Sequence, residues 1–238
     1  MSGTLSGQKV DFKALMKIEA PSPTRSYQPV LHHELADMVH NIGTEVLHDF
    51  SFYKEEYAIV REGRQMFAVH SYKNSSTEMG LSIGFRNSYD KSLSLGVAIG
   101  GSVFVCSNLV FNGDVTVFRK HTANVMLDLK KLILDVIFTQ KENYNKLIAD
   151  SANMKNLDVT DDTAFRLMGL IYGRGIVTPR QLPVIKREWL EPQHPAFEDR
   201  NLWSFYNACT EALKTAPPAV IMEKHIKLHQ IFFSGGVA

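Results

Sequence analysis

The chain of 238 residues has almost no excess charge and only two cysteines. Lys and Arg total 26 against 25 Asp and Glu, a formal net charge of +1, which excludes a strongly basic arm or an acidic tail. Cys106 and Cys209 lie far apart in apolar runs, and the chain begins Met-Ser-Gly without the features of a secretion signal. We therefore expect a cytoplasmic protein with buried, reduced thiols.

Long hydrophobic runs and common enzyme motifs are also missing. The most apolar stretch, 129–138, is interrupted by Lys130, Lys131 and Asp135, so we expect no membrane-spanning helix and no membrane partner. The sequence has no phosphate-binding loop, no dinucleotide-binding glycine pattern and no nucleophile elbow. We accordingly predict no cofactor, no metal and no enzyme of a well-marked class.

The middle of the chain has the alternating pattern of strands, and the end has the pattern of helices. The residues predict an antiparallel meander of about six strands, 57–60, 66–69, 81–85, 93–99, 103–111 and 115–118, with turns at Gly100-Gly101 and Asn112-Gly113. One helix precedes the sheet and ends near Gly43. Strands followed by helices define an α+β protein with the helices packed on the sheet.

After the sheet we expect helices that begin at Thr122, at Thr160 and at Thr178-Pro179, and a further helix over 202–213. Proline-rich composition near 20–24 indicates an N-terminal arm that is flexible or draped over the rest of the molecule. The predicted organisation is therefore an extended arm over 1–29, an α+β core with a long helix over 30–150, and a C-terminal helical subdomain over 151–238 packed on the core.

The most unusual local feature is the polar block 86–92 between two apolar strands. A tight hairpin does not need so many different polar groups, so one interpretation is a binding loop that uses Arg86 and Lys91 for an anion. The other is a polar loop whose side chains bond the neighbouring backbone. Arg119, Lys120 and His121 form a second candidate anion site where a strand gives way to a helix. Sequence alone leaves open whether the two segments meet.

Several other clusters have a weaker pattern. His32, His33, Asp37 and His40 have helical contact spacing without a recognised metal motif, and a solvated helix face is the favoured interpretation. The same interpretation is favoured for His225 and His229. Aromatic residues next to basic ones would suit base stacking, but aromatic residues in strands are mainly core.

The block from Gly84 to Ser92, with Val103 to Phe111 and Lys120-His121-Thr122, resembles the central signature of the family catalogued as domain of unknown function 932. The segments 175–182 and 202–212 are similar to the end of its phage members, and the resemblance covers about 21–232. It implies a protein of a bacteriophage, prophage or plasmid that acts in the bacterial host cell, in DNA metabolism or on a host factor. It implies no activity residue by residue.

Our leading hypothesis is a non-catalytic protein that binds single-stranded nucleic acid and assists DNA recombination or replication. Phosphates would contact the cations, bases would stack on Tyr89 or Phe85, and Asn87 and Ser88 would orient the loop. The predicted nucleic-acid-binding residues are Arg86, Asn87, Ser88, Tyr89, Lys91, Arg119, Lys120 and His121.

Two alternatives belong to other classes. The first is a module that binds and modulates a host protein through Trp189, Trp203 and the proline-rich connection between helices. The second is a nucleotide-binding or small-ligand enzyme that uses Arg86, Asn87, Asp90 and His121. A sheet followed by a long helix is also loosely similar to single-strand annealing proteins, whose protomers form rings, so a homo-oligomer is a further expectation.

Overall fold

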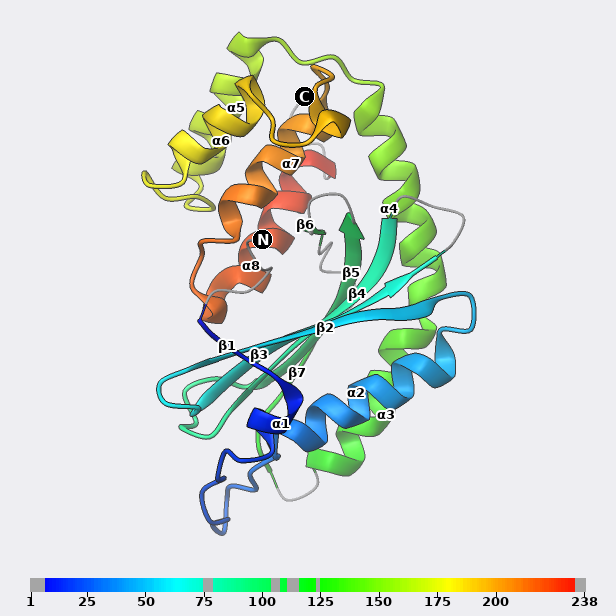
Figure 1. Ribbon diagram of the computed structural model, residues 1–238, viewed down its shortest axis with the longest axis vertical. Coiled ribbons are helices and arrows are strands. Elements are labelled where there is room, and N and C mark those ends of the chain that lie inside the picture. The colour runs from blue at the N-terminus through cyan, green and yellow to red at the C-terminus, as the bar shows by residue number, and fades with distance from the viewer. Residues whose placement is uncertain (1–6, 75–78, 104–107, 111–115, 123–124, 234–238) are drawn as a thin grey trace.

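The protein is α+β, as the sequence predicts: an antiparallel sheet lies across the middle of the molecule, with helices below it and above it in Figure 1. The computed structural model describes residues 7–74, 79–103, 108–110, 116–122 and 125–233. Within these residues no helix has the length and apolar character needed to cross a membrane.

Seven strands of the described residues form one sheet in the order β1-β2-β3-β4-β5-β6, and β7 also pairs with β5. All the pairs are antiparallel, and β6 and β7 follow one another along the same edge of β5. The strands are β1 (Gln8–Val10), β2 (Ser51–Val60), β3 (Gln65–Lys73), β4 (Met79–Ser88), β5 (Leu95–Val103), β6 (Asn108–Val110) and β7 (Thr116–Arg119).

Three details of the predicted sheet are wrong or lie outside the described residues. Gly100 and Gly101 are not a turn but lie inside β5, opposite Ser82 and Leu81 of β4. β4 continues to Ser88, so the first three residues of the polar block are strand rather than loop. The predicted Asn112-Gly113 turn lies outside the described residues. The N-terminal arm is not extended throughout, because it contributes β1, which pairs with β2, and the short helix α1 (Phe12–Leu15).

Helices α2 (His32–Val46) and α3 (Val125–Phe138) cover one face of the sheet (Figure 1). α2 continues past Gly43, where the sequence predicts its end. The glycine does not end the helix but leaves room for Tyr72 of β3, since a Cβ at residue 43 would lie 2.1 Å from the Tyr72 hydroxyl. α3 is the helix that the sequence predicts after Thr122, and Thr139 separates it from α4 (Gln140–Lys155), which the sequence did not predict.

The C-terminal helices are α5 (Asp161–Gly173), α6 (Leu182–Leu190), the 3-10 turn η1 (Pro195–Phe197), α7 (Leu202–Leu213) and α8 (Pro218–Phe233). Thr160 caps α5 as predicted, accepting a hydrogen bond from the Thr163 backbone N–H. α6 begins three residues later than Pro179, and α8 was not expected because Pro217-Pro218 suggests an end rather than a start. Proline is in fact compatible with the first helical turn.

Two large hydrophobic clusters account for most of the core. One joins α2 and α3 to the sheet through residues such as Leu35, Val39 and Ile83, and the other joins the C-terminal helices around Trp189, Phe205 and Tyr206. α4 contributes to both, because Tyr144 belongs to the first cluster and Leu147 and Met154 to the second. A smaller cluster places α8 on the second face of the sheet, against Phe67, Val69 and Ala98.

Candidate nucleic-acid interface

The two segments that the sequence singles out meet at one end of the sheet, on the left in Figure 1. The antiparallel order brings the tip of the β2–β3 hairpin, the β4–β5 connection and the end of β7 to the same end. Asn87 of β4 and His121 after β7 are in direct contact, since the His121 Nε2 lies 2.7 Å from the Asn87 Oδ1. Sequence positions 34 residues apart thus belong to one structural unit.

Asn87 is the centre of a buried hydrogen-bond network. Its Nδ2 donates to the Val30 carbonyl at 2.6 Å and lies 3.0 Å from the His32 Nδ1, while its Oδ1 accepts from the Ser88 backbone N–H. The His32 Nε2 lies 2.9 Å from the Gly63 carbonyl, so His32 donates there and accepts from Asn87 in its neutral form. The network joins the N-terminal arm, α2, two hairpin ends and the segment leading to α3.

Aromatic rings complete this network and are buried with it. Tyr89 stacks on His32 with ring centroids 3.8 Å apart, and its hydroxyl accepts from the His32 backbone N–H. The Tyr27 ring lies 5.4 Å from the His121 ring. Burial lowers the pKa of His32 to about 4 and also lowers that of His121, so both imidazoles are neutral at pH 7. Tyr89 and Phe85, the predicted stacking residues, are both buried, and His32 covers one face of the Tyr89 ring.

Asp90 holds the β4–β5 connection in place. It accepts from the Ser88 hydroxyl at 2.6 Å, from the backbone N–H and hydroxyl of Ser92, and from Gln65 and Arg61. Burial alone would raise the pKa of Asp90, but the hydrogen bonds from Ser88 and Ser92 outweigh it and hold the pKa below its usual range. With five donors, the hydrogen-bonding capacity of the carboxylate is satisfied. The bond from the Ser92 backbone N–H also holds the backbone of Lys91, whose φ is +61°.

Arg86 points to the opposite face of the sheet, where it contacts α8. Its Nη1 donates to the Glu223 carboxylate at 2.7 Å and to the Ala219 carbonyl at 3.0 Å, and the Phe118 ring lies 5.0 Å from its guanidinium carbon. Only 8% of the Arg86 side chain is exposed. Arg86 is therefore engaged in holding the C-terminal helix on the sheet.

Arg61, Lys91, Arg119 and Lys120 are exposed at this end of the sheet and are here called the sheet-end cations. Arg64, which is also exposed in the β2–β3 turn, lies instead in the wall of a pocket. Lys91 Nζ lies 4.6 Å from the centroid of the Tyr27 ring, which in turn contacts His121, next to Lys120. Arg119 stands opposite Leu95 at the start of β5. Arg61 pairs with Asp90 at 3.0 Å, yet 63% of its side chain is exposed. Three separate segments thus supply positive charge to one edge.

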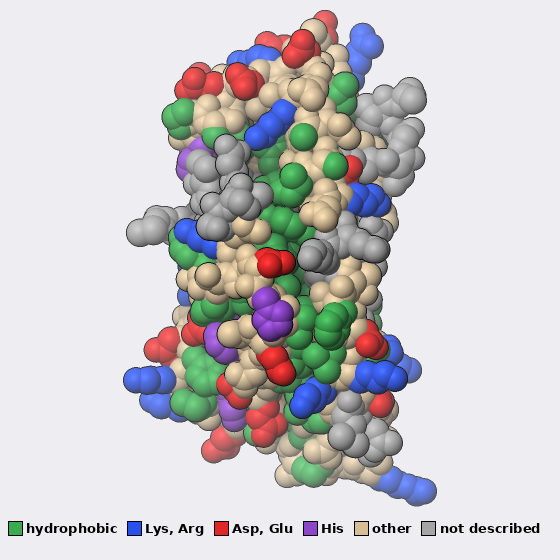
Figure 2. Space-filling view, turned by 90° about the vertical axis from the view of Figure 1, so that its right-hand side faces the viewer, with side chains coloured by type: hydrophobic (Ala, Val, Ile, Leu, Met, Phe, Trp, Pro, Cys, Tyr) green, Lys and Arg blue, Asp and Glu red, His purple; other side chains and the backbone are tan. Residues whose placement is uncertain are grey.

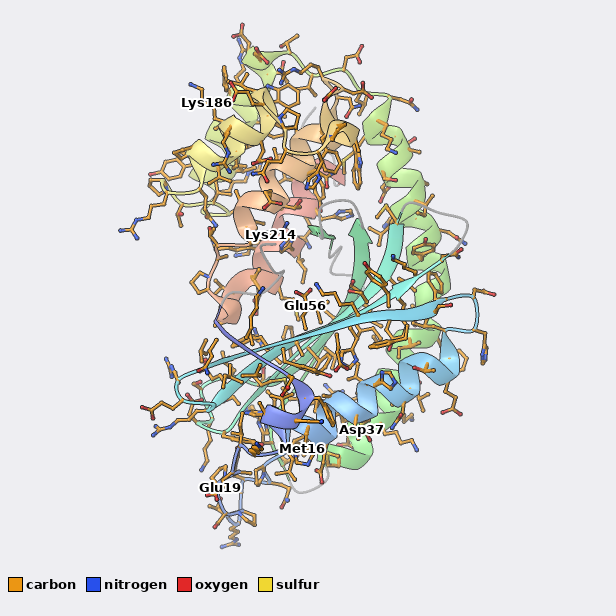
Figure 3. The ribbon with its side chains drawn as sticks, in the orientation of Figure 1. Met16, Glu19, Asp37, Glu56, Lys186 and Lys214 are labelled. Atoms are coloured by element: carbon orange, nitrogen blue, oxygen red, sulfur yellow. The ribbon has the colours of Figure 1, made fainter. Side chains whose placement is uncertain are left out.

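A pocket of about 410 Å³ lies beside the same end of the sheet. Its wall combines the arm residues Ile18 to Pro21 with Arg64, Tyr89 and Asp90. Glu19 of this wall is labelled in Figure 3. A second pocket of about 370 Å³ lies elsewhere, between the end of α2 and the α3–α4 junction. The side of the molecule shown in Figure 2 has its Lys and Arg side chains scattered among acidic ones around a hydrophobic band.

The solvated helix face favoured for the weaker histidine clusters is wrong for His32, His225 and His229, which are buried because they pack under neighbouring elements. In the described part of the chain no group of three or more His, Cys, Asp or Glu is arranged to hold a metal ion. Trp189 and Trp203 are buried in the helical core, so neither is available for the interface that the sequence suggested. Cys209 is fully buried, which raises the pKa of its thiol, and Cys106 lies outside the described residues.

Sequence reasoning did not connect Tyr27, Val30, His32 and Gly63 with the polar block. The signal was weak: these residues are 31 to 62 positions away from their hydrogen-bond partners along the chain, and none belongs to a recognised motif. Only the number of different polar groups in 86–92 indicated that something unusual occurs here, and the structure resolves them into a buried network and an exposed rim.

The fold and this network define an α+β protein whose sheet end is assembled from four separate chain segments. The model of the family described as domain of unknown function (DUF932) matches residues 21–224, and the chain belongs to this family. No curated protein and no solved structure matches the chain.

Proposed function

We propose that the sheet-end cations bind the phosphates of single-stranded nucleic acid, in support of DNA recombination or replication and without a covalent step. The observation that carries the proposal is that Lys91, Arg119 and Lys120 converge on one rigid edge although the chain as a whole has a net charge of +1. Local positive charge of this kind attracts a polyanion by releasing its counterions.

The buried network supports this assignment by fixing the edge. Lys91 follows the carboxylate of Asp90, and Lys120 precedes His121, which is bonded to Asn87. Cations held by rigid strands bind a phosphate chain with less loss of conformational entropy than cations on a mobile loop. Phe118, which is 40% exposed and adjacent to Arg119, is the aromatic ring on which a base could stack.

The proposed roles therefore change within the predicted set. Phosphate is contacted by Lys91, Arg119 and Lys120. The edge is positioned by Asn87, Ser88, Tyr89 and His121, and α8 is positioned by Arg86. Arg61 joins the phosphate-binding group because it is exposed at the same edge.

The test is fluorescence anisotropy with a labelled single-stranded oligonucleotide at several salt concentrations. Each phosphate contact contributes about −0.7 to the slope of log affinity against log salt concentration for single strands. The variant Arg119→Gln/Lys120→Gln should reduce the slope by about 1.4 if both residues contact phosphate. The matched control is Arg180→Gln/Lys227→Gln, which removes two exposed cations from the helical region. Absence of binding at low salt, or equal slopes for both variants, would contradict the proposal.

A small-ligand function is the second candidate, and the pocket beside Tyr89 and Asp90 favours it. Nucleotides should then raise the unfolding temperature in a thermal-shift screen, and Arg64→Gln should abolish the shift because Arg64 is the cation in the pocket wall. No shift with any nucleotide excludes this candidate while leaving the oligonucleotide test untouched.

A further inference from the structure

The pocket of about 370 Å³ lies at the opposite end of the sheet from the sheet-end cations. Its walls come from the end of α2, the turn that leads into β2, the start of β4 and the junction of α3 and α4, on the right-hand side of Figure 1. Leu81, near the start of β4, is part of the wall, whereas the cations gather around the end of this strand. The pocket is therefore separate from the proposed nucleic-acid interface.

Contacts between elements hold the walls of the pocket in place. The Phe50 and Tyr144 rings meet edge to face with their centroids 5.0 Å apart, which joins the segment before β2 to α4. The Tyr144 hydroxyl donates to the Met79 carbonyl at 2.7 Å, which joins α4 to β4. α3 ends where the backbone N–H and the hydroxyl of Thr139 both donate to the Asp135 carbonyl. Because these contacts form the pocket without a ligand, binding costs little conformational entropy.

Most of the pocket wall is apolar. Leu47, Leu81 and Ile137 belong to the core cluster around α2 and α3 and also line the pocket. Phe138 lines it as well and is 72% exposed, the highest value among the large hydrophobic side chains of the described residues. Hydrophobic side chains also reach the surface on this side of the molecule in Figure 2. An exposed aromatic ring beside an apolar pocket is typical of a ligand-binding site.

The polar part of the lining is small and carries little charge. It consists of His48, Asp49, Asn74 and Asn145. Among the described lining residues Asp49 is the one acidic group, and none is Lys or Arg. An anion would have no cation in this wall to pair with, whereas a neutral heteroatom finds imidazole and amide groups as hydrogen-bond partners. The lining therefore favours an uncharged ligand over an anion.

We propose that this pocket binds a small uncharged heteroaromatic molecule of two fused rings. An apolar cavity of about 150 Å³ holds one benzene molecule, so a pocket of about 370 Å³ has room for a two-ring compound. The rings would pack against Leu81, Ile137 and Phe138. The heteroatom would face His48 or Asn145, which are exposed and stand at the mouth of the pocket.

Indole is the first probe, and its binding is followed through the backbone amide signals of the isotope-labelled full chain. Because a two-ring probe is small, we expect a dissociation constant on the order of 1 mM. The largest shifts should occur in 46–50 and 137–145. Indole-3-propionate has the same rings and a carboxylate, and it should bind about fivefold more weakly or worse. No saturable shift with indole, shifts centred on the sheet-end cations, or equal binding of the two probes overturns the proposal.

Asn145→Trp tests the position of the site, because an indole side chain at the mouth of the pocket competes with the free probe. We expect about a tenfold or greater loss of indole affinity with an unchanged or higher unfolding temperature. The matched control is Ala149→Trp, which adds the same side chain to an exposed position of α4 outside the pocket lining. This control should bind indole as the wild type does.

Phe138→Ala is a second variant that does not depend on how a new side chain packs. Because Phe138 is largely exposed, its truncation should hardly change the unfolding temperature. Loss of one aromatic wall should weaken indole binding about threefold or more. The matched control Phe165→Ala removes another exposed ring, on α5, and should leave indole binding unchanged. Wild-type affinity in both Asn145→Trp and Phe138→Ala would place the probe elsewhere and overturn the proposal.

Discussion

The side-chain amide of Asn87 and the imidazole of His121 are joined by a hydrogen bond of 2.7 Å in the interior of the sheet end. Around it, Asn87 also bonds Val30 and His32, so one amide satisfies donors and acceptors from two other segments of the chain, 30–32 and the one that holds His121. A buried network of this kind is stabilising only while every member is paired.

Asn87→Ala should lower the free energy of unfolding by about 2–4 kcal/mol, because it leaves buried groups of His121, His32 and Val30 without their partner. Urea unfolding followed by circular dichroism measures the change. Asn153→Ala, on the exposed side of α4, is the matched control and should cost less than about 0.5 kcal/mol. Equal effects of the two variants would show that the network contributes little to stability.

The contact between Arg86 and Glu223 should be visible as a coupling energy. Arg86→Met removes the charge that binds the carboxylate and the Ala219 carbonyl, and we expect a loss of about 2–3 kcal/mol. Glu223→Gln should cost less because its amide oxygen still accepts a hydrogen bond. A double-mutant cycle should give a coupling of at least about 0.5 kcal/mol. Strict additivity would mean that the pair does not hold α8 on the sheet.

Acidification should destabilise the protein through its buried histidines. Burial lowers the pKa of His32 to about 4 and that of His70 to about 3, so between pH 6.5 and these values the unfolded chain binds more protons than the folded one. Stability is therefore complete above pH 6.5 and falls with pH, by about 2 kcal/mol per such histidine at pH 5.

His70→Gln should flatten this pH dependence between pH 7.5 and pH 5, whatever its effect on stability at pH 7.5. Denaturant unfolding at the two pH values gives the difference. The exposed His48 provides the control variant His48→Gln. A slope unchanged by His70→Gln would show that His70 does not contribute to the acid sensitivity.

Two glycines in helices should respond in opposite ways to alanine. Gly43→Ala places a methyl group against the Tyr72 hydroxyl and should destabilise the protein by about 1–3 kcal/mol. Gly169→Ala meets no described neighbour and should stabilise the protein by about 0.5–1 kcal/mol. Thermal unfolding compares them. Stabilisation by Gly43→Ala would mean that the Tyr72 side chain can move away from residue 43 without cost.

The exposed cations should matter for ligand binding and hardly at all for stability. Lys91→Gln, Arg119→Gln and Lys120→Gln should each change the unfolding free energy by less than about 0.5 kcal/mol, because their side chains are in solvent. Oligonucleotide affinity at low salt should fall in each. Loss of stability without loss of affinity would assign these residues a structural role.

The sequence by itself determined the class of the fold. Period-two patterning followed by helical patterning predicts an antiparallel sheet with helices packed on it, and local signals such as Thr160 before Asp161 and Asp162 correctly locate a helix start. The helix 202–213 was found with its observed bounds. Such signals are local, because capping and periodicity depend on residues a few positions apart.

Only the tertiary structure decided which residues of the polar block 86–92 are buried and which are exposed. Its pattern suits an exposed binding loop as well as a strand end, and composition cannot choose between them. Residues far along the chain decide between the two: Glu223 forms an ion pair with Arg86, and Val30, His32 and His121 form hydrogen bonds with the side-chain amide of Asn87. The net charge of +1 likewise does not say where exposed positive charge gathers on the surface. Packing buries Arg86, whereas Lys91, Arg119 and Lys120 remain exposed together at the sheet end.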